Sequence, residues 1–199
     1  MARKGEATRA RLLEAARTVF ERDGFSAARV TDIAEEAGMV ASGVYHYFDS
    51  KEAIFRELVR SQEEALVATG EWEDGLLASP SDLEAIRHSV ERYLDRFREQ
   101  AGLVSVIEQV ARHDPEVNAI RLAIIDDFVV RAEGEIRRLQ DEGVADPALD
   151  PRITADALIA MASRLAELWL VEDARDYDVD RVTDTLTTIL ANVLGISRG

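Results

Sequence analysis

The chain has 199 residues, 47% of them hydrophobic and 32% charged, which is the balance of a globular protein with a sizeable core. It has no cysteine and only three histidines, which excludes a disulfide framework and a thiolate zinc site, and we expect neither a metal nor a cofactor. No run reaches the roughly 18 apolar residues of a membrane span, and the amino end does not resemble a signal peptide. We therefore expect a cytoplasmic protein.

The net charge of −15 is unevenly distributed along the chain. Residues 1–56 hold nine Lys/Arg and nine Asp/Glu, so the remainder carries the whole excess of acid. A neutral amino-terminal module can still turn a basic face outward, with Arg9, Arg11 and Arg17 among its cations. The overall acidity therefore does not exclude nucleic acid as a partner.

The amino-terminal segment predicts three helices in quick succession. The first covers residues 6–22 and ends near Gly24, and the second covers residues 30–37. A glycine-bearing turn at 38–40 separates the second helix from a third at 41–47. This order of short helix, tight turn and short helix is typical of a helix-turn-helix.

The rest of the chain predicts longer helices with clear start and stop signals. A long helix begins at about Lys51, and "EWEDGLLASP" is the one break before a capping box at Ser81-Asp82-Leu83-Glu84. Two further starts combine a capping Asp with Pro, at Asp114-Pro115 and Asp150-Pro151. We expect an all-α fold of about nine helices, ending with core-forming helices at 151–171 and 178–194, and no strand.

Four rings stand side by side in "GVYHYFDSKE", and they cannot all be core. On a helix Val44 and Phe48 share the inward face, which leaves Tyr45, His46 and Tyr47 near the surface. Their hydroxyl and imidazole groups can donate to an anion, and the next helix start favours a phosphate. The run predicts a cradle for a phosphate backbone, although aromatic cover of a small three-helix core is the alternative.

Residues 8–59 resemble the DNA-binding domain of the TetR family of transcriptional regulators. The shared features occur in order along about 50 residues: the apolar pattern of the first helix, Gly24-Phe25, Asp32-Ile33-Ala34, Ala37-Gly38, Tyr45-x-Tyr47-Phe48 and Ser50-Lys51-Glu52. The resemblance implies a helix-turn-helix domain at 1–50 and a helical ligand-binding and dimerisation domain at 51–199. It also implies a homodimer that binds a palindromic operator in double-stranded DNA. Most proteins that the chain resembles repress by steric exclusion, and activation is the alternative.

The resemblance further implies which residues meet DNA. Phosphates would be contacted by Arg29, Thr31, Tyr45, Tyr47 and Lys51, and base edges by Ala41, Ser42, Gly43 and His46. The chain departs from the family pattern because Val40 stands where a capping Ser is usual, Gly43 where Thr or Ser is frequent, and Arg29 where Thr often caps. The third helix also lacks Arg, Lys, Asn and Gln, so we expect specificity from Ser42, thymine methyls, DNA shape and an Arg3-Lys4 arm.

The last two helices have broad apolar faces, which predict burial against a second copy in a four-helix bundle. The alternative is that these faces fill the protomer's own core. The expected interface comprises Leu158, Met161, Leu165, Leu168, Trp169, Val182, Leu186, Ile189, Leu190 and Val193.

A small-molecule effector site is only weakly indicated by the sequence. Side chains that could line a cavity in the apolar body are Trp72, His88, Tyr93, Gln109, His113 and Trp169. The stretches "LVSVIEQVARHDPEV" and "LQDEGVADPALDP" are similar to bodies of members that control lipid or sterol degradation, which implies an apolar, acyl-CoA-like effector.

Two other classes of function compete with a regulator. An enzyme could use the carboxylates and the histidine of "EQVARHDPE", but Glu108 and His113 lie on different helical faces, and no catalytic motif accompanies them. A helical carrier or interaction module that has lost DNA binding is the second alternative. A steep salt dependence of binding to duplex DNA would separate a regulator from both.

Overall fold

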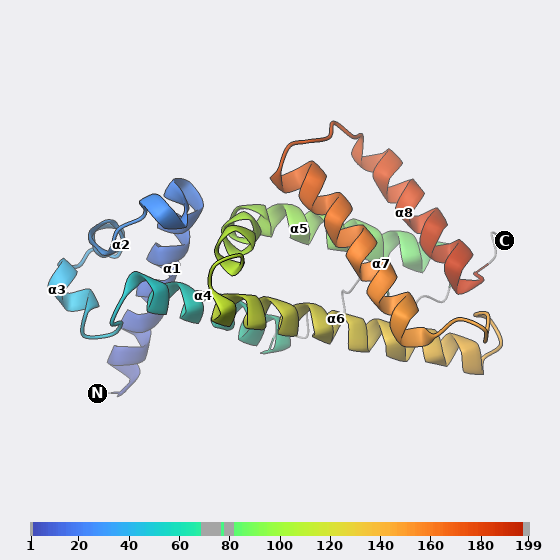
Figure 1. Cartoon of the computed structure of the whole chain (residues 1–199), viewed down its shortest axis with the longest axis horizontal. Helices are drawn as coiled ribbons and strands as arrows, with labels where there is room; N and C mark the ends of the chain where they lie inside the picture. Colours follow the sequence, from blue (N-terminus) through green and yellow to red (C-terminus); the bar gives the residue numbers. More distant parts are fainter. Residues whose placement is uncertain (1, 69–76, 78–81, 197–199) are drawn as a thin grey trace. The chain divides into compact units, whose positions relative to one another are not determined.

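The computed structural model describes residues 2–68, Leu77 and residues 82–196. In this part of the chain the elements are α1 (Ala2–Ala27), α2 (Val30–Glu36), α3 (Ala41–Val44), α4 (Lys51–Ala68), α5 (Leu83–Ala111), α6 (Pro115–Asp141), α7 (Pro151–Ala166), the π-helical η2 (Glu167–Val171) and α8 (Val179–Leu194) (Figure 1). The described residues contain no strand, so the predicted all-α fold is confirmed. None of the described helices is both long enough and apolar enough to cross a membrane.

The chain divides into two compact units. The first comprises Met1–Ala65 and Gly102–Leu122, and the second comprises Leu66–Ala101 and Ala123–Gly199. Helices α5 and α6 therefore contribute residues to both units. The domain boundary predicted after residue 50 follows the helix-turn-helix motif rather than these units, and it stays a prediction.

An aromatic cluster forms the centre of the first unit. Phe20 and Phe25 stack with ring centroids 5.6 Å apart, and Phe55 meets each of them edge-on at 5.1 Å. Such ring pairs add to the hydrophobic gain of burial, and Phe20 and Phe55 are completely buried. Helix α1 is longer than predicted and is kinked at Gly24, whose φ of 73° suits glycine, so that the chain turns and places Phe25 against the other two rings.

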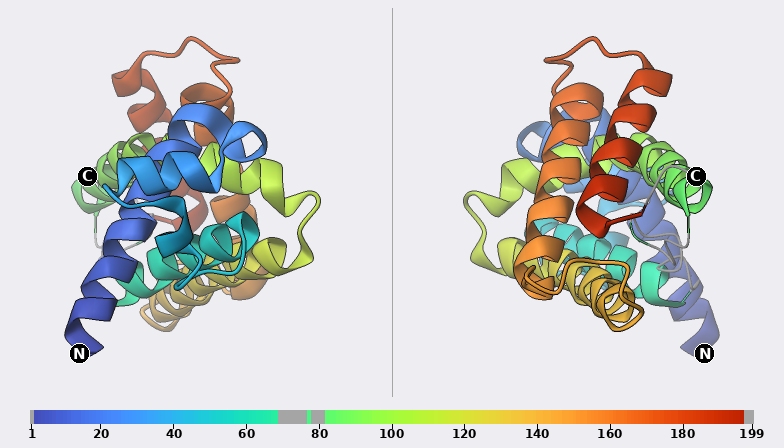
Figure 2. Two further views of the ribbon diagram at one scale, coloured as in Figure 1. Left: turned by 90° about the vertical axis from the view of Figure 1, so that its left-hand side faces the viewer. Right: turned by 90° about the vertical axis from the view of Figure 1, so that its right-hand side faces the viewer.

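The core of the second unit is apolar and comes from four helices. Figure 1 shows α7 and α8 side by side and running in opposite directions, and the right-hand view of Figure 2 agrees. The largest fully buried side chains of this core include Ile86 and Leu94 of α5, Ile136 of α6 and Leu186 of α8. At about 25 cal/mol per Å² of apolar surface, burial of such side chains is the main stabilising term of the unit.

Candidate nucleic-acid interface

A tight turn joins α2 to α3, and its geometry follows from glycine and local capping. Arg29 is extended just before α2, and its N–H donates to Asp32 Oδ2 at 3.1 Å. After α2, Gly38 takes a φ of 63°, which a residue with a Cβ adopts only at a cost. The N–H of Met39 then donates to Ala34 O at 2.8 Å, which closes the turn. The predicted turn at 38–40 is confirmed.

Helix α3 is shorter than predicted. It ends at Val44, whereas the sequence predicted a helix as far as Tyr47. The following amides bond three residues back, from His46 to Gly43 O at 3.3 Å and from Tyr47 to Val44 O at 2.9 Å. This tighter winding suits a run of rings, which have modest helix propensity. The recognition segment is therefore residues 40–47, made of a short α-helix and the turns after it.

The orientation of the rings matches the prediction. Val44 is fully buried and Phe48 is 4% exposed, whereas Tyr45 is 55% exposed. His46 and Ser42 are also exposed, and Ala41, Gly43 and Tyr47 are half-buried. The recognition segment thus presents hydroxyl groups, an imidazole and small side chains to its surroundings, and residues 37–48 include no charged side chain.

Arg9 of α1 braces the recognition segment from within the unit. Its Nη1 donates to Tyr47 O at 2.9 Å, its Nε and Nη2 bond the carboxylate of Glu57 in α4, and its guanidinium lies 4.4 Å from the centre of the Phe48 ring. A bidentate Arg–carboxylate pair is strong and directional. From its sequence neighbours Arg9 is predicted only as a surface cation, because nothing local to residue 9 indicates partners 38 and 48 residues away.

Lys51, at the start of α4, directs its ammonium group toward the end of α1. Nζ donates to Phe25 O at 2.6 Å, Ala28 O at 2.9 Å and Ser26 O at 3.4 Å, and it lies 4.6 Å from the centre of the Phe25 ring. An ammonium group has three donors, and all three have a protein acceptor. The phosphate contact predicted for Lys51 stays a prediction, and it has to compete with these bonds.

The remaining predicted DNA contacts lie at or beyond the margin of the recognition segment. Arg29 and Thr31 are exposed at the start of α2, where both can reach a ligand. The side chains of Arg3 and Lys4 lie outside the described part of the chain, so the predicted arm has no structural account.

Residues 12–58 match the model of the family described as bacterial regulatory proteins, tetR family. This is the same stretch that builds the braced helix-turn-helix. Residues 12–58 form a DNA-binding domain of the TetR family. This domain, together with the similarity to curated HTH-type regulators, indicates a transcriptional regulator.

Two curated relatives extend the likeness beyond the DNA-binding module. The HTH-type transcriptional regulator YfiR of Bacillus subtilis is 29% identical over 93% of this chain and 91% of its own length. The HTH-type transcriptional repressor KstR2 of Mycolicibacterium smegmatis is 28% identical over 73% of this chain and 69% of its own.

Two solved structures share the whole fold. A protein from Saccharomonospora viridis in complex with choline has a TM-score of 0.80 at 22% identity and covers 97% of this chain and 100% of its own. The regulator FadR from Bacillus subtilis in complex with stearoyl-CoA has a TM-score of 0.72 at 18% identity, over 94% of this chain and 99% of its own. At these identities the likeness concerns the fold.

The residues predicted to bind an effector are distributed over both units, and their role stays a prediction. Tyr93 and Trp169 pack against the core of the second unit, and Tyr93 Oη donates to Ser163 Oγ at 3.2 Å. Burial raises the pKa of the Tyr93 hydroxyl to about 12. Gln109 and His113 are exposed, and Trp72 lies outside the described residues.

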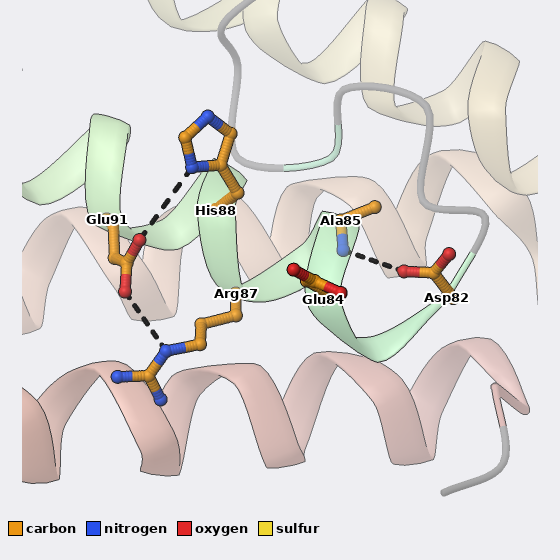
Figure 3. A pocket seen from close by; sticks show the side chains of 6 residues that line it. All are labelled: Asp82, Glu84, Ala85, Arg87, His88 and Glu91. Atoms are coloured by element: carbon orange, nitrogen blue, oxygen red, sulfur yellow. Dashed lines mark hydrogen bonds and ion pairs between the residues drawn. The ribbon is translucent and has the colours of Figure 1, made fainter. Parts of the chain in front are cut away.

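His88, the sixth predicted residue, lies on an open and charged face of α5. Figure 3 shows it with Asp82, Glu84, Arg87 and Glu91 around a hollow at the helix start. Its Nδ1 is 3.8 Å from Glu91 Oε2, and Arg87 Nε bonds the other oxygen of Glu91 at 3.0 Å. This surface suits water and ions better than an apolar ligand. Asp82 Oδ1 accepts from the Ala85 N–H at 2.8 Å at the start of α5, and Ser81, the first residue of the predicted capping box, lies outside the described residues.

The predicted dimer residues divide into two groups. Four of them are at most 6% exposed within the single protomer and so already pack in its own core, and their assignment to an interface stays a prediction: Leu158, Val182, Leu186 and Leu190. The other six are half-buried: Met161, Leu165, Leu168, Trp169, Ile189 and Val193. The sequence alone does not distinguish the buried from the half-buried residues, because the apolar pattern of a helix does not indicate which edge of its apolar face packs against the protomer's own helices.

The charged stretch considered for catalysis has structural contacts. Glu108 pairs with Arg121. Asp114 accepts from the N–H groups of Glu116 at 2.9 Å and Val117 at 3.1 Å, which makes it the cap of α6.

Proposed function

We propose that this regulator is a repressor that binds a palindromic operator as a homodimer and is released by a small apolar effector. The observation that carries the proposal is the recognition segment, whose exposed Ser42, Tyr45 and His46 face outward while Arg9 braces the backbone behind them. A helix-turn-helix reads base edges with the first residues of its second helix.

The proposed contacts with DNA are of two kinds. Arg29, Thr31, Tyr45 and Tyr47 would hold phosphates and fix the register, whereas Lys51, the fifth predicted contact, would keep its bonds to the carbonyl groups of Phe25 and Ala28. Ala41, Ser42, Gly43 and His46 would meet the base edges. With no Arg, Lys, Asn or Gln in the segment, specificity would depend on shorter contacts and on DNA shape.

The homodimer is supported by the outer face of α7 and α8. On α7 the exposed Ile153, Ala157 and Ala160 follow helical spacing as far as Arg164, whose charge pairs with Glu167 and Glu172. On α8 the exposed or half-exposed positions after Asp184 are uncharged: Thr185, Thr188, Ile189, Asn192 and Val193. In a chain with 32% charged residues, such a face favours a protein partner.

The effector is proposed from chemistry and from the relatives. The core of the second unit is apolar, with Tyr93, Phe97 and Trp169 at its margin and the Tyr93–Ser163 pair as a polar anchor. FadR is bound to stearoyl-CoA, and KstR2 is a repressor. A long acyl chain would have to open this core, which would couple binding to a change of conformation.

Selection of genomic fragments by the purified protein, at near-physiological salt with competitor DNA, tests the DNA half. An enriched palindrome with half-sites about one helical turn apart supports the proposal. A folded, dimeric protein that enriches no sequence contradicts it and favours the carrier alternative.

The effector half needs its own measurement on the selected operator. Stearoyl-CoA is expected to release the protein from the operator and to raise its melting temperature, with free coenzyme A and choline as comparison ligands. Release by coenzyme A alone, or by none of the three, would contradict an apolar acyl effector.

A further inference from the structure

We propose that Val40 reads the C5-methyl group of a thymine in each half-site of the operator. The inference rests on the proposed operator binding and assigns a base contact to a residue outside the predicted set. Its starting point is a residue that conflicts with the local structure it occupies.

Val40 is the N-cap of α3, and valine is among the poorest residues for that position. Its side chain has no oxygen to accept from the first amides of the helix, and no side-chain cap bond is present. At 72% exposure it is also the most exposed large hydrophobic side chain in the described part of the chain. Neither local stability nor the core therefore accounts for a valine here.

The surroundings of Val40 keep its methyl groups accessible. Gly43 has no side chain, and a Cβ built on it would lie 3.9 Å from Val40 Cγ2 and 3.2 Å from Met39 Cε. Any larger residue at 43 would therefore cover part of Val40 and press on Met39. Met39, Val40 and Gly43 together form a small apolar surface, the apolar corner, where the recognition segment begins.

The chemistry of the major groove selects one partner for the apolar corner. Among the groups that the bases present there, the thymine methyl is apolar, and it is read by contact with aliphatic side chains. The first residues of a recognition helix reach base edges, which places residue 40 at the right point of the motif. Residues 37–48 have no charged side chain that could read guanine at this point instead.

The test removes a single methyl group from each partner. In the selected operator, each thymine is replaced in turn, symmetrically in both half-sites, by deoxyuridine, which lacks only the C5-methyl. Binding is measured with the unaltered protein, with Val40→Ser and with Val144→Ser, a control at a 40% exposed valine of the second unit. Thermal unfolding of each variant accompanies the binding measurements, and Val40→Ser is expected to melt at an equal or higher temperature, because serine is a good cap.

At one thymine position we expect deoxyuridine to weaken binding by the unaltered protein about fourfold per half-site, or about fifteenfold for the symmetric pair, as burial of one methyl predicts. The same replacement should change binding by Val40→Ser less than twofold, whereas Val144→Ser should behave as the unaltered protein does. An equal loss in Val40→Ser and the unaltered protein at every position would overturn the assignment of Val40 and leave the operator intact. Failure of the unaltered protein to select any operator would instead overturn the proposed function, and this inference with it.

Discussion

At the scale of single residues, two cations of the DNA-binding module direct their charge at the protein itself. Arg9 bonds Glu57 and the carbonyl of Tyr47, and Lys51 bonds three carbonyls at the end of α1. Both side chains join segments that are distant in sequence. The position of the recognition segment therefore depends on charge-assisted bonds as well as on apolar packing.

Lys51→Met is expected to lower the free energy of unfolding by about 2 kcal/mol, because it leaves carbonyl groups of Phe25 and Ala28 without their charged donor. The salt dependence of DNA binding should remain that of the unaltered protein. Urea denaturation and DNA titrations at several salt concentrations measure the two quantities. Unchanged stability with a flatter salt dependence would instead favour the phosphate contact that the family resemblance implies.

At the scale of elements, helix ends with strong local chemistry were predictable from sequence. Asp150 accepts from the Ile153 N–H at 2.9 Å and Pro151 begins α7, as the Asp-Pro pair predicted. The predicted helix start at Asp114-Pro115 is confirmed as well. In both cases the signal and its effect lie within a few residues of each other, so no tertiary contact is needed to interpret them.

Elements that depend on distant contacts were not predictable to the same degree. Just after the end of α3, Phe48 is buried and Arg9 donates to Tyr47 O, and neither contact can be predicted from the neighbouring residues. The π-helical η2 adds a residue to a helical turn, and Arg164 spans it by pairing with Glu167 at 2.6 Å and Glu172 at 2.7 Å. An apolar pattern of period 3.6 continues through such a turn without marking it.

Two glycines in the second unit have opposite expected responses to alanine. Gly134 lies in α6 with open space around it, so Gly134→Ala should raise the free energy of unfolding by about 0.5–1 kcal/mol. Gly195 ends α8 at a φ of 71°, and a Cβ there would lie 2.3 Å from Val144 O. Gly195→Ala should therefore cost at least about 1–2 kcal/mol in urea denaturation. If Gly195→Ala does not change the free energy of unfolding, the backbone at the end of α8 must shift to accommodate the added Cβ.

The cap of α6 predicts a pH-dependent contribution to stability. Burial of the Asp114 carboxylate acts to raise its pKa, but hydrogen bonds from Arg56 and from two backbone amides outweigh it and hold the pKa below the ordinary 3.8. A carboxyl group that binds its proton less tightly when folded stabilises the fold above about pH 4, and this contribution is lost as the pH falls through the folded pKa.

Asp114→Asn keeps a capping side chain and removes the charge, so it should be less stable than the unaltered protein at pH 7 and approach it below pH 4. Asp114→Ala removes the cap as well and should cost about 1 kcal/mol more at pH 7. Unfolding by urea between pH 3 and pH 7 measures both differences. If the difference in unfolding free energy between Asp114→Asn and the unaltered protein does not become smaller in acid, the difference comes from packing and not from the charge.

At the scale of the whole molecule, the acidic charge and the nucleic-acid interface are separated along the sequence. The excess of Asp and Glu lies after residue 56, and the helix-turn-helix is neutral overall. Repulsion between the acidic part and DNA would oppose non-specific binding, so affinity has to come from a few well-placed contacts. A homodimer doubles those contacts without any change in sequence.

We expect the protein to sediment as a dimer at micromolar concentration without DNA. Ala157→Glu places a charge between the exposed, uncharged Ile153 and Ala160 of α7 and should shift the protein to monomer and weaken operator binding by at least tenfold. Ala148→Glu, at an exposed alanine before α7, is the matched control and should remain dimeric. A dimeric Ala157→Glu variant would place the interface elsewhere on the molecule.

The salt dependence of operator binding measures how many cations of the protein contact DNA phosphates. Arg29 is exposed at the start of α2, whereas Arg9 and Lys51 are held by internal bonds. Each phosphate neutralised contributes about −0.9 to the slope of log K against log salt, so Arg29→Gln in both protomers should flatten the slope by about 2. The loss of affinity caused by Arg29→Gln should be similar for operator and random DNA, because a phosphate contact carries no sequence information.

Val40→Ser should instead alter the sequence preference and leave the slope of log K against log salt unchanged. If Arg29→Gln leaves the slope unchanged, the phosphates must be contacted by other cations of the amino-terminal module.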